Sequence, residues 1–201
     1  MAPLAATARA QELASEPLQP RVENADSAVA ATAEPPIIVD HRAPLRLEAS
    51  LTERRIVVKR GGEILAEYPI SVGMPEYRTP TGSFTIEKLI WNPAWVPPDS
   101  PWARDRTAKG PGEPGNPMKV VKIFFQEPDY YIHGTNDRAS LGQASSHGCL
   151  RMSPVSVTQL ARMVMQHGGA PRDDDWFTEV IVGDETRVVR LDTPVELVVV
   201  R

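Results

Sequence analysis

Proline is the residue that most limits what this chain can fold into. The sequence has 20 prolines among 201 residues, which is about twice average usage. A proline removes a backbone donor and fixes its own φ, so the interiors of helices and of central strands tolerate it poorly. The abundance therefore favours strands, turns and ordered loops over a helical bundle.

The totals exclude several classes of protein. A single cysteine permits no internal disulfide, so packing alone must hold the fold together. The formal net charge of −4 provides no basic field, and we expect no nucleic-acid partner. No apolar run reaches about 18 residues, so the sequence predicts no transmembrane helix. The length suits one domain with a sizeable core plus an appendage.

Residues 1–44 are rich in Ala, Glu and Pro and show no sustained hydrophobic period. Such a segment buries too little apolar surface to offset the entropy of ordering, so we expect a disordered N-terminal tether. Within it, Ala5–Gln11 is similar to the small-residue end of a secretory signal. The charged start and apolar core of such a signal do not precede it. A truncated export signal and a simple Ala-rich tail both stay open.

A globular domain is predicted over residues 45–201. Its first half alternates apolar and polar residues with β-branched enrichment, the pattern of strands. Gly61 and Gly62 predict a hairpin turn, because glycine adopts positive φ without steric cost. The predicted strands are Leu45–Ala49, Arg54–Lys59, Ile64–Val72, Ser83–Leu89, Val120–Phe125, Tyr130–His133, Thr186–Leu191 and Val195–Val200, the last two joined through residues 192–194.

Two helices are predicted near the C-terminus. Ser153 supplies an N-cap and Pro154 a first helical residue for a helix that runs to about His167. Its apolar face consists of Val157, Leu160, Ala161 and Val164. Residues 173–175 predict the cap of a second, short helix that ends at Gly183. The expected fold class is therefore mainly β with a few helices.

The connection over residues 90–117 combines many prolines with three of the four tryptophans: Trp91, Trp95 and Trp102. A connection this long inside a domain is usually a binding loop, a lid or disordered. Disorder is disfavoured, because tryptophan side chains are costly to leave in water. Two roles stay open for them: a plug at the edge of the sheet, or a wall of a substrate site.

The only cysteine, Cys149, lies in a polar segment, with His147 close before it and His133 farther upstream. A thiolate, not a thiol, attacks a carbonyl, so a catalytic cysteine needs a base or a positive neighbour. His147 is tied to Cys149 by a short link that limits its approach. His133 ends a different predicted strand and can lie across the site. We therefore pair Cys149 with His133.

Cys149 could also be a structural residue or a metal ligand. A lone cysteine is often a small buried hydrophobe, but two His-Gly pairs and the helix cap that follows make this the weaker interpretation. A zinc site built from His133, His147 and Cys149 lacks a fourth ligand at a typical spacing. We expect no metal and no organic cofactor.

These residues resemble the signature of the L,D-transpeptidase family, the YkuD-type catalytic domain. His133–Thr135 followed by Ser146–Arg151 carries the resemblance, which extends over roughly residues 45–200. It implies a β-sandwich-like catalytic domain whose cysteine is acylated by a peptidoglycan stem peptide. Cys149 would be the nucleophile and His133 the proton donor and acceptor.

The resemblance also implies roles for the neighbours of the pair. Ser146, His147 and Gly148 would shape the site, and the Gly148 and Cys149 amides would donate to an oxyanion. The Gly134 carbonyl would hold the His133 tautomer.

Three further residues are candidates for substrate binding: Tyr131, Trp95 and Arg151. The Arg151 side chain would either pair with a stem carboxylate or hydrogen-bond the loop backbone, and the second is slightly favoured.

Two segments depart from the family pattern. Many members carry Asn-Pro-Leu-Gly before the central strand, whereas this chain has Asn116–Lys119, so we expect a differently shaped wall beside the site. Residues 171–190 are longer than in minimal members and resemble a larger periplasmic branch.

The expected function is formation of 3→3 cross-links between peptidoglycan stem peptides, by a monomer in the periplasm or cell envelope that carbapenem-type inhibitors acylate. Water as acceptor would instead give an L,D-carboxypeptidase or endopeptidase, and an envelope-protein amine would give an anchoring enzyme. An idle wall-binding module is the alternative of another class, and an intact Cys149 and His133 argue against it.

Overall fold

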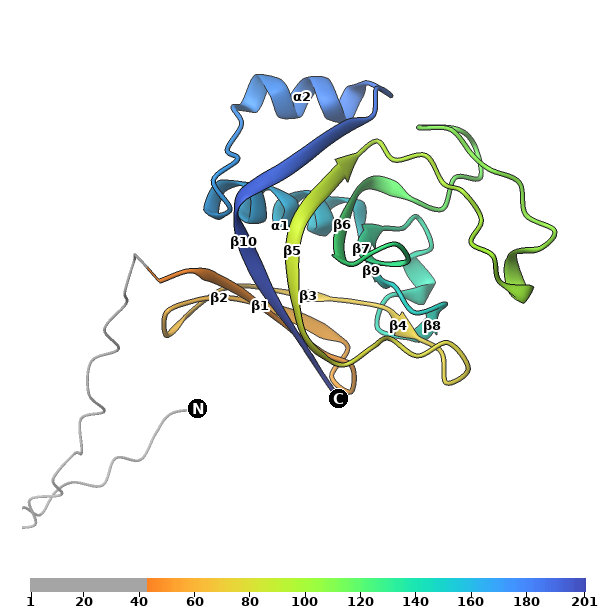
Figure 1. Ribbon diagram of the computed structural model, residues 1–201, viewed down its shortest axis with the longest axis horizontal. Helices are drawn as coiled ribbons and strands as arrows, with labels where there is room; N and C mark the ends of the chain where they lie inside the picture. Colours follow the sequence, from red (N-terminus) through yellow and green to blue (C-terminus); the bar gives the residue numbers. More distant parts are fainter. Residues whose placement is uncertain (1–42) are drawn as a thin grey trace, which may run out of the picture. The chain divides into compact units, whose positions relative to one another are not determined.

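The computed structural model describes residues 43–201, which form a mainly β domain (Figure 1). Eight strands make one sheet in the order β3-β2-β1-β10-β5-β6-β7-β9. They are β1 (Leu45–Ser50), β2 (Arg55–Arg60), β3 (Glu63–Pro69), β5 (Gly82–Trp91), β6 (Lys119–Gln126), β7 (Tyr130–Gly134), β9 (Leu150–Met152) and β10 (Arg187–Val200). The predicted fold class is confirmed, whereas the tether predicted over residues 1–44 lies, except for its last two residues, outside the described residues.

The remaining elements complete the domain around this sheet. Strands β4 (Val72–Gly73) and β8 (Ala144–Ser146) form a separate two-stranded ribbon. The helices are α1 (Pro154–His167) and α2 (Asp174–Val182), and the short 3₁₀ turns are η1 (Pro101–Ala103) and η2 (Arg138–Ser140). Pairing is parallel between β1 and β10 and between β7 and β9 in the main sheet, and antiparallel elsewhere in it.

Helix α1 packs its apolar face against β6, β7 and β10. The Ser153 side chain caps it by accepting a hydrogen bond from the Ser156 amide at 3.0 Å, as its sequence predicts. Its predicted apolar face is confirmed, since Val157, Leu160 and Val164 are fully buried. The helix therefore supports the back of β7, and Ile132 on that strand is buried in the same core.

One predicted strand, Ile64–Val72, is divided in the structure. Strand β3 ends at Pro69, which has no N–H to continue a ladder. Ser71 then exchanges backbone hydrogen bonds with Arg151, at 2.9 and 3.0 Å, and Val72 pairs with β8. The prediction of one strand is wrong because the chain leaves the edge of the sheet at β3 and continues beside β9.

The two strands predicted at the C-terminus are a single strand, β10. It pairs with β5 on both sides of an irregularity, where Lys88 faces Arg190 and Ile86 faces Val195. The residues between these pairs, 191–194, lie opposite Glu87 alone. Residues 192–194 were predicted to join two strands. They form a bulge within one strand instead, because β10 pairs with the same strand, β5, before and after them.

Replacing Leu160 with alanine should destabilise the domain by about 2–5 kcal/mol, because its fully buried side chain leaves a cavity between α1 and the sheet. Chemical denaturation followed by far-ultraviolet circular dichroism measures the loss. Val155→Ala on the same helix is the control, since Val155 is 68% exposed, and it should change stability by less than about 0.5 kcal/mol. Equal effects of the two substitutions would contradict the packing described for α1.

Candidate active site

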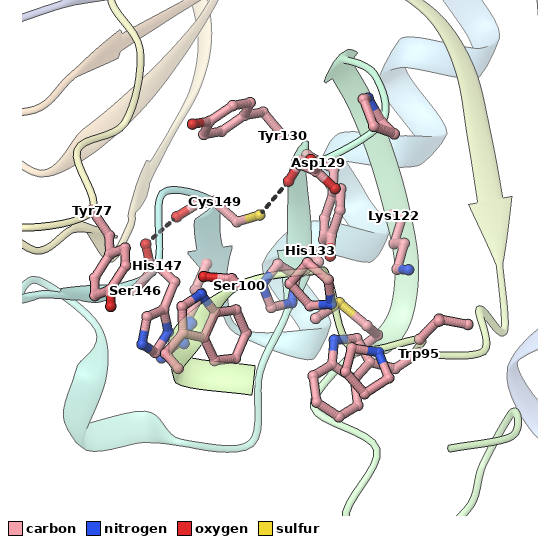
Figure 2. Close-up of a pocket in the computed structure, with 18 of the residues that line it drawn as sticks. Tyr77, Trp95, Ser100, Lys122, Asp129, Tyr130, His133, Ser146, His147 and Cys149 are labelled. Carbon is pink, nitrogen blue, oxygen red and sulfur yellow. Dashed lines mark hydrogen bonds between the residues drawn. The ribbon is translucent and has the colours of Figure 1, made fainter. Parts of the chain in front are cut away.

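A cavity of about 560 Å³ gathers most of the predicted site residues (Figure 2). It lies where β7 ends and β9 begins, under the connection between β5 and β6. The predicted residues that line it are Trp95, Tyr131, His133, Ser146, His147, Cys149 and Arg151. Of the predicted set, only Gly134 and Gly148 do not line it, and both act on lining residues through the backbone.

The register of three neighbouring strands arranges the site. Lys122 on β6 faces His133 on β7, and His133 faces Arg151 on β9. Residues opposite each other on paired strands project from the same face, as do residues two positions apart on one strand. Tyr131 is two positions before His133 on β7 and shares this face, and Cys149, which precedes β9, lines the same cavity. We call Lys122, His133 and Arg151 the cross-strand row.

His133 is held in one orientation by the next residue. Its side chain is 3% exposed, and its Nδ1 atom lies 2.9 Å from the Gly134 carbonyl oxygen. A carbonyl only accepts, so Nδ1 carries the proton and the Nε2 lone pair is left to act as a base. The contact predicted for the Gly134 carbonyl is present.

Gly134 also has a steric reason to be glycine. A Cβ atom there would lie 2.5 Å from the Lys119 carbonyl oxygen and 3.1 Å from the Val157 side chain. The absence of a side chain therefore lets β7 approach both β6 and α1 at the residue after His133.

Burial lowers the pKa of His133 to about 3. The hydrogen bond with Gly134 opposes this shift, and the positive charges of Arg151 and Lys122 add to it. The imidazole is therefore neutral at neutral pH.

Cys149 rests as a thiol. Burial raises its pKa to about 11, although hydrogen bonds from Tyr131 and the charges of Arg151 and Lys122 favour the thiolate. The Sγ atom donates to the Asp129 carbonyl oxygen at 3.2 Å (Figure 2). Within residues 43–201 no hydrogen bond joins Cys149 to His133, so the thiol must leave Asp129 to transfer its proton to the imidazole.

Ser146 organises the turn before Cys149. Its hydroxyl donates to the Cys149 carbonyl at 2.6 Å and accepts from the Gly148 amide at 3.1 Å. Gly148 has φ +110, and a Cβ atom there would lie 2.8 Å from the Tyr130 ring, so no other residue fits. The Gly148 amide, which was predicted to donate to an oxyanion, donates to the Ser146 hydroxyl in this arrangement.

His147 is clamped between aromatic rings instead of meeting the nucleophile. Its ring stacks on Trp102 with centroids 3.9 Å apart and meets the Tyr77 ring edge at 4.8 Å. Burial lowers its pKa, and Arg151 and Arg106 lower it further. Its place is that of a site-shaping residue that holds the β5–β6 connection over the cavity.

The tryptophans of that connection divide between the two predicted roles. Trp91 is fully buried at the end of β5 and packs on Phe177 of α2, with ring centroids 5.6 Å apart. Trp95 and Trp102 line the cavity. The plug therefore describes Trp91, whereas Trp95 and Trp102 form part of the cavity wall, and contact with a substrate stays a prediction for them.

Asn116 anchors the same connection. Its buried side-chain amide donates to the carbonyls of Pro93, at 3.0 Å, and Gly110, at 2.8 Å. Two residues later, Met118 lines the cavity, and Lys119 replaces the glycine expected from the family pattern at the start of β6.

Lys122 is a site residue that sequence reasoning missed. Its Nζ atom donates to the Ala94 carbonyl at 3.2 Å and lies 4.8 Å from the centroid of the Tyr131 ring. A charged residue inside the apolar run of residues 120–125 was the available signal. The face to which it points depends on strand register, which the sequence alone does not give.

Arg151 lines the cavity on the opposite side of His133. The sequence slightly favoured a hydrogen bond from its guanidinium to the loop backbone, but no such bond is present in the described part of the chain. Its backbone, in contrast, is paired with Ser71. Its charge is therefore available to the cavity.

Metal-binding side chains are not grouped in the described residues, where no three His, Cys, Asp or Glu side chains lie so as to hold a metal ion. No helix between residues 43 and 201 has the length and apolarity to cross a membrane.

Relatives in sequence carry the same catalytic domain. The model of the YkuD family, the L,D-transpeptidase catalytic domain, matches residues 44–196. "Putative L,D-transpeptidase YkuD" of Bacillus subtilis (strain 168) is 30% identical over 121 residues, which are 60% of this chain and 61% of that protein. "Probable L,D-transpeptidase YbiS" of Escherichia coli (strain K12) is 29% identical over 144 residues, which are 68% of this chain and 41% of that protein. The chain thus spans well under the full length of both.

Solved structures share the fold at lower identity. An L,D-transpeptidase from Mycobacterium smegmatis superposes with a TM-score of 0.50 at 19% identity, over 79% of this chain and 59% of that one. The Ldtfm–avibactam carbamoyl enzyme gives a TM-score of 0.51 at 17% identity, over 79% and 49%. The family match spans most of the chain, and the chain therefore belongs to the family of YkuD-type L,D-transpeptidase catalytic domains.

Proposed function

We propose that this protein is a peptidoglycan L,D-transpeptidase that forms 3→3 cross-links through an acyl-enzyme on Cys149. The observation that carries the proposal is that one thiol and one oriented, neutral imidazole line the same cavity. Family membership supports the reaction class. Because stem peptides are met outside the cytoplasmic membrane, we place the activity in the periplasm or cell envelope.

The first half-reaction acylates the enzyme. The Cys149 Sγ atom attacks the carbonyl between the third and fourth residues of a tetrapeptide stem, and its proton passes to His133 Nε2. A carbon–sulfur bond forms, and the tetrahedral intermediate then collapses. The carbon–nitrogen bond breaks, the imidazolium returns the proton to the leaving nitrogen, and D-alanine departs from a thioester.

The second half-reaction transfers the acyl group. The side-chain amine of a diaminopimelate on a neighbouring stem attacks the thioester, and His133 accepts its proton. The new amide forms as the thiolate leaves and takes the proton back. The 3→3 cross-link and the resting enzyme result.

The electrostatics of the cavity set the character of both steps. A thiol pKa of about 11 beside an imidazole pKa of about 3 disfavours a resting thiolate–imidazolium pair. Proton transfer must therefore accompany bond formation to carbon. The imidazolium, once formed, is a strong acid and readily protonates the leaving amine. Lys122 and Arg151 favour the negative charge that develops between these steps.

Inhibitor sensitivity belongs to the same proposal. The Ldtfm–avibactam carbamoyl enzyme is a covalent adduct of a protein with this fold. We expect carbapenem-type inhibitors to acylate Cys149 here.

Incubation of the protein with a disaccharide-tetrapeptide should give a cross-linked dimer and free D-alanine, read by mass spectrometry. Cys149→Ala should give neither, and His133→Gln should lose at least about 100-fold in rate, the scale of a general acid–base contribution. A tripeptide as the sole product would identify water as the acceptor, and a protein conjugate would identify an anchoring enzyme.

A carbapenem provides the control for the nucleophile. One adduct should appear on the wild type by intact mass and none on Cys149→Ala. Dimer formation by Cys149→Ala would contradict the proposal outright.

The rate of alkylation by iodoacetamide should rise about tenfold per pH unit from about pH 6 to about pH 9, because only the thiolate reacts and the thiol pKa is raised to about 11. Cys149 is the only cysteine in the chain, so intact mass reports its modification alone. His133→Gln should keep this slope. A rate independent of pH across this range would reveal a preformed thiolate and contradict the neutral pair.

A further inference from the structure

The cavity contains two basic side chains, although the protein has a net charge of −4 and Asp99 and Asp129 also line the cavity. Lys122 and Arg151 both line it, one on each side of His133. Within residues 43–201 no ion pair involves either of them. The charge of Asp137 acts on Arg151 without forming an ion pair. Two half-buried cations that form no salt bridge with the described residues can still bind an anionic ligand in the space between them.

A bulge in β6 places Lys122 in this row. Lys119 faces Gly134, so regular antiparallel pairing would put Val120 opposite His133. Val120 has φ +64 instead, a strained value for a β-branched residue. The bulge moves the register forward, and Lys122 faces His133. Bulges of this kind re-aim side chains beside functional sites.

The Lys122 ammonium has hydrogen-bond donors that its contacts within the protein do not use. One donor goes to the Ala94 carbonyl, and the charge lies over the Tyr131 ring. An ammonium has three N–H donors. Burial lowers the pKa of Lys122, so an anion bound in the cavity would offset part of the cost of its desolvation.

The proposed reaction fixes where a substrate anion lies. His133 must reach the leaving nitrogen within hydrogen-bond distance to protonate it. The carboxylate of the leaving residue is bonded to the α-carbon next to that nitrogen. Cys149 holds the acyl group next to β9, the strand that carries Arg151. The carboxylate of the leaving residue is therefore held beside His133 on the opposite side, away from the acyl group.

We infer that Lys122 binds the terminal carboxylate of the residue that the reaction expels, and so makes the enzyme selective for donor peptides that end in a free acid. The inference rests on the proposed function and deepens it. It makes Lys122 a specificity-determining residue, with its ammonium paired to the carboxylate and its link to Ala94 connecting that pair to the loop above the cavity.

The test compares donor tetrapeptides that end in D-alanine with matched donors that end in D-alaninamide. The amide has nearly the same shape but no charge. The wild type should prefer the acid in kcat/KM by about tenfold or more, the scale of a hydrogen bond between charged groups. Lys122→Met should remove the preference, mainly through KM, and Lys122→Arg should restore part of it.

Lys88→Met is the matched control. Lys88 lies over the Phe124 ring, with Nζ 4.4 Å from the centroid, much as Lys122 lies over Tyr131. It is paired with Glu127 and does not line the cavity. This variant should keep the acid preference of the wild type.

Several outcomes would overturn the inference. An equal loss on acid and amide in Lys122→Met would limit Lys122 to its effect on the charge that develops in the reaction and would remove the carboxylate site. A preference that survives Lys122→Met would assign the anion to another group. A third donor is amidated at an internal stem carboxylate and keeps the free terminal acid. It should react as fast as the acid donor. If the wild type reacted more slowly with it, and Lys122→Met removed that difference, Lys122 would bind the internal carboxylate instead of the terminal one.

Binding separates this inference from the proposed function. Calorimetry in the Cys149→Ala background measures the affinity for the acid and the amide without turnover. Suppose that the wild type forms no product, but the protein binds the acid selectively and Lys122→Met removes that selectivity. This result would contradict the proposed function and support the carboxylate site. Turnover without any difference between acid and amide would overturn the carboxylate site alone.

Discussion

The pairing of β6, β7 and β9 is the constraint on which the site depends. Parallel pairing of β9 with β7 places Arg151 opposite His133, and Cys149, just before β9, lines the same cavity. Helix α1 packs against β7, and Gly134 lets this strand approach both β6 and α1 closely. A slip of one residue would turn His133 into the core and Ile132 into the cavity. The buried apolar face therefore maintains the catalytic register.

Burial has a second consequence, which concerns the proton. Burial and two nearby cations disfavour the charged form of the His133 imidazole, and burial disfavours the thiolate form of Cys149. The pair rests uncharged and transfers its proton only when carbon accepts the sulfur. The same cations that keep the imidazole neutral favour the anionic intermediate, so one charge arrangement serves both the resting state and the reaction.

Local signals in the sequence predicted much of this. Ser153 and Asp173 cap the two helices as expected, because caps depend on a few adjacent residues. Cys149 and His133 were paired because His133 ends a separate predicted strand and can lie across the site, and both line one cavity. Non-local geometry accounts for what was missed. The break after Pro69, the continuity of β10 and the bulge at Val120 are all set by pairing partners distant in sequence. Lys122 was overlooked because its orientation follows from that bulge.

The protonation state of His133 tests the neutral catalytic pair most directly. Nitrogen-15 NMR of histidine-labelled protein, with the His133 signals assigned by comparison with His133→Gln, reports both the charge and the tautomer of the ring. We predict a neutral ring protonated at Nδ1 that does not titrate between about pH 5 and about pH 8, the range in which an ordinary histidine changes charge. An imidazolium at neutral pH, or a neutral ring protonated at Nε2, would contradict the neutral pair.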